Sequence, residues 1–232
     1  MNQKVELSKR LTLVSRMVTV GNTVADIGCD HGFVSIYLVM NNISPHVIAM
    51  DINKGPLEIA MTHIREYGME KYIEARRSDG TRMLNQGEAD TIICAGIGGR
   101  LMVKILDEGS QVLAGVKEIV LQPQSDIEMV RKYLREHNFR ITAEEAVFEE
   151  GKYYFILKCI HDEPESVNTE IQILYDKFGP KLIQNRNMVL IDYLRYRQLR
   201  YQEIFIDMPE TASRYNEIQK ELSDIGKALQ LF

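Results

Sequence analysis

The chain has 232 residues, of which 45 % are hydrophobic and 26 % are charged, and its formal net charge is −5. This composition supports a buried core, and the length predicts one full domain with an appendage or two small domains. The negative charge weighs against a general nucleic-acid binder, although the clustering of positive charge matters more than the total. No apolar run approaches the roughly 20 residues of a membrane span, so we expect no membrane association.

The three cysteines, Cys29, Cys94 and Cys159, lie in or beside apolar runs and form no C-x-x-C pair. This spacing argues against zinc ligands and a disulfide framework, and it predicts reduced thiols in a cytoplasmic protein without a metal. Cys94 continues an apolar run, so we expect a buried strand residue and not a catalytic nucleophile.

The first predicted element is a helix over 5–18, in which Leu7, Leu11, Val14 and Val18 recur at spacings of four, three and four residues. Short apolar runs further on predict buried strands at 24–28, 46–51, 72–77, 89–94 and 117–122. Longer segments between them predict helices at 33–42, 56–67, 100–108 and 127–137. Alternating strands and helices of this length indicate a parallel sheet with helices on both faces.

The alternation ends with two strands, 140–148 and 153–160, which turn around Gly151 and leave no room for a helix between them. They predict an antiparallel hairpin that closes the parallel sheet. Nucleotide-dependent dehydrogenases usually end on another parallel strand, whereas methyltransferases end on an antiparallel one. The predicted fold class is therefore α/β, with a Rossmann-like sheet of the class I methyltransferase type and an antiparallel closing hairpin.

The composition changes after the hairpin, and the polar segment 161–166 predicts a domain boundary. We expect a catalytic domain at 1–162 and a helical domain at 163–232. Because the sheet is complete before the boundary, we expect a chain that ends near Pro164 to fold and to bind its cofactor.

The helical part contains two segments with apolar residues at three- and four-residue spacing, around 190–204 and 215–229. Met208 and Pro209 separate them. Two narrow apolar seams with a short connection predict an antiparallel, coiled-coil-like helical hairpin.

A glycine-rich turn with several acids follows the first predicted strand, in the stretch VADIGCDHGF at 24–33. Its pattern, in which Gly28 and Gly32 lie four residues apart, differs from the G-x-G-x-x-G turn that holds a pyrophosphate on backbone amides. Asp26 and Asp30 would repel a pyrophosphate. They suit S-adenosylmethionine, which has an ammonium, a sulfonium and no phosphate. A tight turn without a ligand is the alternative.

Two further acids follow the next strands. Asp51 stands where a carboxylate accepts hydrogen bonds from both hydroxyls of a ribose. Asp79 stands where a carboxylate can meet the adenine amino group. Together with the closing hairpin, these acids favour a binding site for S-adenosylmethionine over a ligand-free turn.

The loop at 95–99, with the sequence AGIGG, stands where methyltransferases of exocyclic amines carry an Asp/Asn-Pro-Pro-aromatic run. Ring N1 of adenine needs no such run, because its lone pair lies in the plane of the base and attacks directly. The base must be exposed, and N1 must lie about 3–3.5 Å from the methyl carbon. Glycines let the backbone approach cofactor and base, although a loop-to-helix turn without a ligand is the plainer alternative.

Seven stretches carry a resemblance to a known family: LSKRL at 7–11, VADIGCDHGF at 24–33, AMDINKGPLEIA at 49–60, SDGTRML at 78–84, CAGIGGRLM at 94–102, VLQPQ at 120–124 and EEGKYYFI at 149–156. They resemble the bacterial tRNA adenine-N1 methyltransferases that act on position 22, the TrmK family. Gly32-Phe33 and Ile97 depart from its usual Ala-Tyr and Met. The C-terminal helices match only in type.

The resemblance implies methylation of N1 of adenine 22 in tRNA, with S-adenosylmethionine as the methyl donor. A methyltransferase of a small molecule or of another RNA base is one alternative. A non-catalytic tRNA- or protein-binding module is another, and it predicts decay of the cofactor residues. We expect a monomer or a weak dimer.

Three residues are expected to act on the base: Asp30, Gly96 and Gln122. Asp30 stabilises the cationic product or holds the cofactor ammonium, and Gln122 hydrogen-bonds the adenine edge or caps the following helix. The expected cofactor-binding residues are Arg10, Asp26, Gly28, His31, Gly32, Asp51, Ile52, Asn53, Asp79, Gly80, Ala95, Gly96 and Gly98. Within this set, Arg10 pairs with the methionine carboxylate or is solvated, and His31 lines the pocket or is structural.

Positive charge clusters between Lys177 and Arg200, a stretch in which Asp192 is the only acid. Tyrosines lie among these cationic residues. Lysines and arginines there can neutralise tRNA phosphates, with a solvated helix face as the alternative. The residues expected to bind tRNA are Lys177, Lys181, Arg195, Arg197 and Arg200, together with Arg77 and Arg100 at the rim of the catalytic domain.

Overall fold

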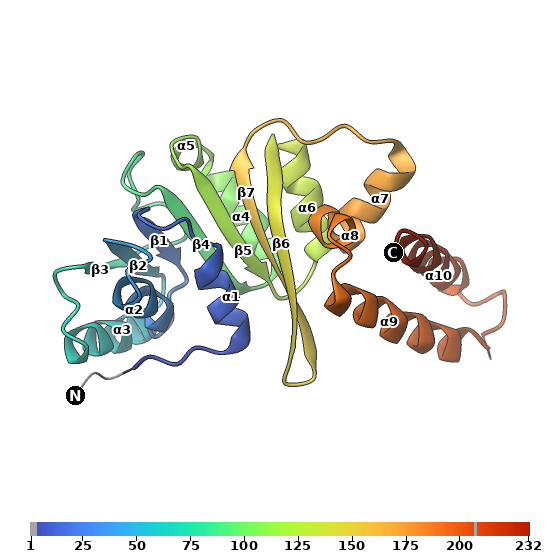
Figure 1. Cartoon of the computed structure of the whole chain (residues 1–232), viewed down its shortest axis with the longest axis horizontal. Coiled ribbons are helices and arrows are strands. Elements are labelled where there is room, and N and C mark those ends of the chain that lie inside the picture. The colour runs from blue at the N-terminus through green and yellow to red at the C-terminus, as the bar shows by residue number, and fades with distance from the viewer. Residues whose placement is uncertain (1–3, 207) are drawn as a thin grey trace.

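The computed structural model describes residues 4–206 and 208–232 (Figure 1). Within these residues, seven strands form one sheet in the order β3-β2-β1-β4-β5-β7-β6. The strands are β1 (Val24–Ile27), β2 (Val47–Asp51), β3 (Ile73–Arg77), β4 (Thr91–Ile97), β5 (Glu118–Pro123), β6 (Phe139–Glu149) and β7 (Lys152–His161). The helices are α1 (Lys9–Met17), α2 (Phe33–Met40), α3 (Lys54–Glu66), α4 (Gly99–Glu108), α5 (Ser110–Leu113), α6 (Ile127–Glu136), α7 (Thr169–Phe178), α8 (Pro180–Gln184), α9 (Met188–Ile206) and α10 (Tyr215–Leu229).

The sheet is parallel from β3 to β5 and antiparallel from there on. Strand β7 lies between β5 and β6, with Val120 opposite Lys158. This confirms the predicted α/β fold class with its closing hairpin. The alternation of five apolar runs with helical segments was sufficient to predict it, because parallel strands are buried on both faces and connect through helices.

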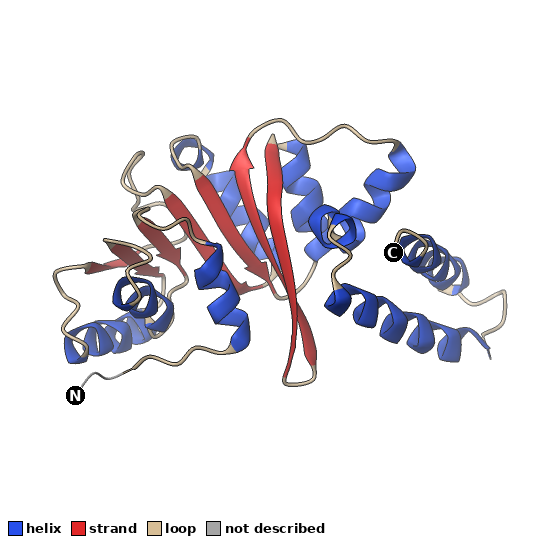
Figure 2. Cartoon of the chain, in the orientation of Figure 1, coloured by secondary structure: helices blue, strands red, loops and turns tan. Residues whose placement is uncertain are grey.

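Helices cover both faces of the sheet (Figure 2). Side chains alternate along a strand, so Ala25 and Ile27 of β1 pack in one apolar cluster with Met102 of α4, whereas Val24 packs in the other with Ile36 of α2. These two layers fix the carboxyl ends of the parallel strands along one edge.

The leading helix is shorter than predicted. Helix α1 begins at Lys9, and the Ser8 side chain caps it by accepting a hydrogen bond from the Leu11 N–H. Apolar spacing alone placed the start at Val5, which is buried but lies outside the helix. An apolar residue just before a helix can be buried in the same way as the apolar residues inside it. Apolar spacing therefore does not locate the start of the helix, and only the capping residue does.

The C-terminal helices pack on the sheet hairpin. Phe155 of β7 belongs to a third apolar cluster together with Phe178, Leu194 and Ile225 of the helical part. Helices α9 and α10 pack against each other, as the predicted helical hairpin requires. The long hairpin β6–β7 reaches beyond the sheet and lies between α1 and α9 (Figure 1).

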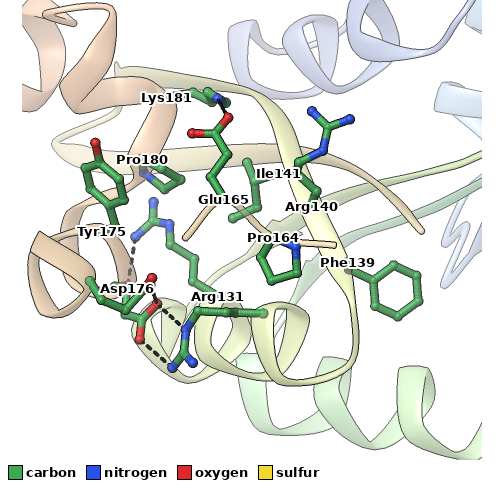
Figure 3. Close-up of a pocket in the computed structure, with 12 residues that line it drawn as sticks. Arg131, Phe139, Arg140, Ile141, Pro164, Glu165, Tyr175, Asp176, Pro180 and Lys181 are labelled. Atoms are coloured by element: carbon green, nitrogen blue, oxygen red, sulfur yellow. Dashed lines mark hydrogen bonds and ion pairs between the residues drawn. The ribbon is translucent and has the colours of Figure 1, made fainter. Parts of the chain in front are cut away.

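A buried ion pair ties the same parts together. Nε of Arg131 donates to Oε1 of Glu144 at 2.8 Å, and both side chains are almost fully buried. Glu144 also accepts from the Lys181 backbone N–H, and Arg131 donates to the Lys177 carbonyl. A small cavity of about 50 Å³ lies at this junction. Figure 3 shows its lining residues, with Lys181 against Glu165. A chain that ends near Pro164 would lack these partners, so the structure leads us to expect that such a chain is destabilised.

Candidate active site

The largest set of predicted site residues lines one cavity of about 550 Å³ at the carboxyl ends of the parallel strands. This volume lies in the range of about 300–1,000 Å³ that is usual for small-molecule sites, and the position is the usual one in open α/β sheets. The predicted residues that line it are Arg10, Asp26, Gly28, Asp30, His31, Asp51, Ile52, Asn53, Asp79, Gly80, Ala95 and Gly96.

The turn after β1 has the backbone conformation that its glycines predict. The φ angles of Gly28, Asp30 and Gly32 are 76°, 50° and 76°, all in the left-handed region. Gly28 and Cys29 donate their N–H groups to the Met50 carbonyl, at 2.8 and 2.9 Å. The chain therefore turns sharply beside the end of β2. This turn brings Asp26 of β1 close to Asp51 at the end of β2.

Two of the predicted residues, Gly32 and Gly98, do not line the cavity. A Cβ at Gly32 would lie 3.1 Å from Cβ of Ala60, so this glycine lets α2 approach α3. A Cβ at Gly98 would lie 3.3 Å from Oγ of Ser125. Both glycines precede a helix and act through packing.

Four carboxylates face the cavity, and they differ in their surroundings. Asp26 is buried and accepts a hydrogen bond from Ser35 at 2.7 Å. Burial raises its pKa to about 6; the Ser35 hydrogen bond opposes the shift, and the negative charge of Asp51 adds to it. Asp51 accepts the N–H groups of Asp30 at 3.3 Å and Asn53 at 2.8 Å. The excess of acid favours a ligand with a positive end.

Arg10 supplies the cavity with a cation. Its guanidinium donates to Oε1 of Gln122 and lies 5.3 Å from the ring centroid of Tyr154. Helix α1 is itself anchored, because Glu149 at the end of β6 accepts the N–H groups of Lys9 and Arg10. The structure thus places Arg10 in the pocket and not in solvent.

Gln122 does not face the cavity as predicted. It is fully buried, its Oε1 accepts from Arg10 and from the Gly96 N–H at 3.1 Å, and its Nε2 donates to the Pro123 carbonyl. Its amide therefore positions the pocket and is not free for adenine. The side chain that lines the cavity from this segment is Gln124, two residues further on.

Sequence reasoning missed the apolar wall of the cavity. Leu101 and Ile105 of α4 line it, as do Ile97 and Phe33. Leu101 is 49 % exposed, so an apolar side chain is held at the surface of the pocket. Such a wall suits the flat face of an adenine, and the apolar stripe of α4 beside the glycine loop was the available signal.

The three cysteines are free and buried. Burial raises the pKa of Cys94 to about 12, and the nearby Asp26 adds to the shift. A thiol that stays protonated is a poor nucleophile, which agrees with the prediction of a structural role. Within residues 4–206 and 208–232, no group of acids, histidines and cysteines is placed to hold a metal ion, and no helix is long and apolar enough to cross a membrane.

The residues predicted to bind tRNA separate into two groups. Lys177 pairs with Glu221 and Asp224, Lys181 with Glu165, and Arg197 with Glu221, so these three cations are engaged within the chain. Arg195, Arg200, Arg77 and Arg100 are exposed, although Arg200 forms a surface ion pair with Glu203 and Arg100 one with Asp126. Of these, Arg77 donates to the Ile52 carbonyl at the rim of the cavity.

Comparisons with known proteins show the family to which this chain belongs. A family model described as a methyltransferase domain matches residues 7–157. The tRNA (adenine(22)-N(1))-methyltransferase of Bacillus subtilis (strain 168) is 30% identical over 224 residues, which cover 95% of this chain and 94% of the relative.

Two solved structures are similar over almost the whole chain. The B. subtilis m1A22 tRNA methyltransferase TrmK has a TM-score of 0.83 at 27% identity, with 98% of this chain and 97% of that chain covered. TrmK of M. capricolum, in complex with S-adenosyl-homocysteine, has a TM-score of 0.86 at 26% identity, with 97% and 98% covered. The chain belongs to the family of tRNA (adenine(22)-N(1))-methyltransferases.

Proposed function

We propose that this protein transfers the methyl group of S-adenosylmethionine to ring N1 of adenine 22 in tRNA. The observation that carries the proposal is the cavity at the strand ends, where four carboxylates and Arg10 surround an apolar wall beside the loop at 95–99. That loop has no Asp/Asn-Pro-Pro-aromatic run. The site can therefore present a base to the methyl donor without orienting an exocyclic amine.

The residues of the cavity fit the chemical groups of the cofactor. Asp51 is placed to accept hydrogen bonds from the ribose hydroxyls, and Arg10 to pair with the methionine carboxylate. Asp26 suits the ammonium, and Asp79 suits the adenine amino group. When bound, S-adenosylmethionine supplies an electrophilic methyl group on a sulfonium.

In this proposal, the loop at 95–99 and Asp30 act on the base. Gly96 has a φ of 80° and lines the cavity, so the backbone comes close to the reacting atoms without a side chain in between. N1 attacks with its own in-plane lone pair, and no proton has to be removed from it first. The side chain of Asp30 is 73% exposed at the cavity, where its charge stabilises the positive charge that develops on the base.

The tRNA backbone is proposed to lie along the exposed arginines. Arg195 and Arg200 are on α9, and Arg77 and Arg100 are at the catalytic rim. In this proposal, residues 1–162 carry the reaction and residues 163–232 hold tRNA. We further propose that the protein works in the cytoplasm, where tRNA is modified, as a monomer or weak dimer.

The product decides the proposal. Purified protein, S-adenosylmethionine and transcribed tRNA should yield N1-methyladenosine, identified by mass spectrometry after chromatographic separation from the N6 isomer. A matched tRNA with guanine at position 22 should remain unmethylated. A product methylated only at N6, or methylation of the control tRNA, would contradict the assignment of the base and its position.

A further inference from the structure

A second and larger cavity lies between the catalytic part and the C-terminal helices. This groove has a volume of about 740 Å³, and its walls come from α6, β7, α9 and α10. Tyr153 and Tyr154 of β7 face it from one side, and Tyr193 and Tyr196 of α9 from the other. It is distinct from the cofactor cavity, although Gln124 lines both.

The groove is aromatic and electrically balanced. Seven of its twenty lining residues are aromatic, whereas aromatic residues make up 8% of the whole chain. Its four cationic side chains are matched by four acidic ones, and Glu221 pairs with both Lys177 and Arg197. A phosphate backbone needs unmatched positive charge. The groove instead offers flat π-faces, which bases prefer.

Tyr196 forms the accessible part of this aromatic surface, whereas Tyr153 is half-buried and packs on Phe148, with ring centroids 4.7 Å apart. The Tyr153 ring centroid lies 5.1 Å from that of Tyr193 and 6.1 Å from that of Tyr196. Tyr196 is 52% exposed, so one face of the cluster remains open. Tyr193 and Tyr201 are engaged on Arg197, with their ring centroids 5.7 and 4.9 Å from its guanidinium carbon.

The groove continues from the cofactor cavity. Arg10 lines that cavity and lies over the ring of Tyr154, which lines the groove. Gln124 lies at the boundary of the two. A nucleotide chain whose target base enters the cofactor cavity can therefore place its neighbouring nucleotides in the groove.

We propose that this groove binds an unpaired tRNA base next to the methylated adenine, by stacking on Tyr196, whose ring is backed by Tyr153. This inference rests on the proposed function, because it takes the substrate to be tRNA. A base that is taken out of a stack leaves its neighbours without a partner. Aromatic side chains replace that partner, and each stacked base contributes about 1–3 kcal/mol, or roughly 5- to 150-fold in affinity.

The test is a binding cycle without S-adenosylmethionine. Full-length tRNA is titrated against the parent protein, Tyr196→Ala and Tyr196→Phe, over a range of salt concentrations. The same titrations use tRNAs that lack the base at one of the two nucleotides flanking adenine 22. Melting curves check that each variant is folded. Because Tyr196 is exposed, we expect its replacement to leave the fold intact.

Stacking predicts a specific pattern. Tyr196→Ala should weaken binding about 5- to 150-fold with an unchanged salt slope, and Tyr196→Phe should restore most of the affinity. With one of the base-lacking tRNAs, the alanine substitution should have little further effect. Equal effects on all tRNAs, no effect, or a slope reduced by about one unit would overturn the proposal. Failure of the proposed function is separate, because there the parent protein would form no N1-methyladenosine.

Discussion

Arg10 and Gln122 are joined by a hydrogen bond that links α1 to the end of β5, 112 residues further along the chain. The same amide oxygen accepts the Gly96 N–H from the glycine loop. One buried side chain thus holds the cation of the cavity and the glycine loop that lines it. Its second interaction, from Nε2 to the Pro123 carbonyl, fixes the orientation of the amide.

Gln122→Ala should weaken binding of S-adenosylmethionine although Gln122 does not line the cavity. Arg10→Ala and Gln122→Ala break the same hydrogen-bond network, so their effects on the binding free energy should not add. The double variant should lose about 0.5–3 kcal/mol less binding free energy than the sum of the losses in the two single variants. Calorimetry measures the three affinities. Gln124→Ala, combined with Arg10→Ala, is the matched comparison, and full additivity in the Arg10–Gln122 pair would contradict the positioning role.

Cofactor binding should weaken at low pH through Asp26. Its pKa of about 6 means that the carboxylate is half protonated near that pH, mainly because burial disfavours the charge. If the ionised form holds the ammonium, the dissociation constant of S-adenosylmethionine should rise about tenfold between pH 7 and pH 5. Calorimetry of the parent and of Asp26→Asn checks this, and the variant should bind weakly with a flat pH dependence.

Stability gives an independent measure of the same group. The unfolded Asp26 titrates near 3.8 and the folded one near 6, so the folded state holds the extra proton between these values. The free energy of unfolding contributed by Asp26 therefore falls as the pH rises through that window. Asp26→Asn should unfold at higher urea than the parent at pH 7.5, and the difference should shrink at pH 5. A pH-independent difference would contradict the raised pKa.

The buried pair of Arg131 and Glu144 should be essential for stability. Glu144→Ala leaves the Arg131 guanidinium uncompensated in the interior, and this should lower the free energy of unfolding by about 3–5 kcal/mol. Urea denaturation measures the change. Asp162→Ala is the matched control, because it breaks an ion pair with Arg140 that is largely exposed, and it should cost much less.

A chain that ends at Pro164 should show the same weakness. It lacks the Lys181 N–H group, which donates a hydrogen bond to Glu144. It also exposes Phe155 to solvent, a side chain that is only 4% exposed in the full chain. We expect it to unfold at lower urea than the full chain, or to aggregate. Unfolding at the same urea concentration would show that the sheet needs no helical cover.

Exposed and engaged arginines of α9 should have separable effects on tRNA. Replacing Arg195 and Arg200 with Gln should weaken tRNA binding and lower the salt slope by up to about one unit for each phosphate that is no longer neutralised. Arg197→Gln should lower the melting temperature, because it removes the pair with Glu221. A folded Arg195/Arg200 double variant with unchanged affinity and slope would leave the catalytic rim, with Arg77 and Arg100, as the place where tRNA phosphates bind.

The local pattern of the sequence determined the positions of the strands, the closing hairpin and the acids of the cavity. Strands that are buried on both faces need continuous apolar runs, and a turn in the left-handed region needs glycines such as Gly28. Asp26 belongs to a parallel strand, and Asp51 and Asp79 end or follow one, so the order of strands along the sheet was enough to bring them together.

Only the tertiary structure decided which side chains remain free to act. Lys177 is engaged by Glu221, 44 residues away, and Arg10 is oriented by Gln122, 112 residues away. The motif at 120–124 has two glutamines: Gln122 is buried within β5, where Arg10 and Gly96 donate to it, whereas Gln124 follows the strand and lines the cavity. Hydrogen bonds and ion pairs of this kind depend on distances across the fold, and composition and spacing along a chain do not contain those distances.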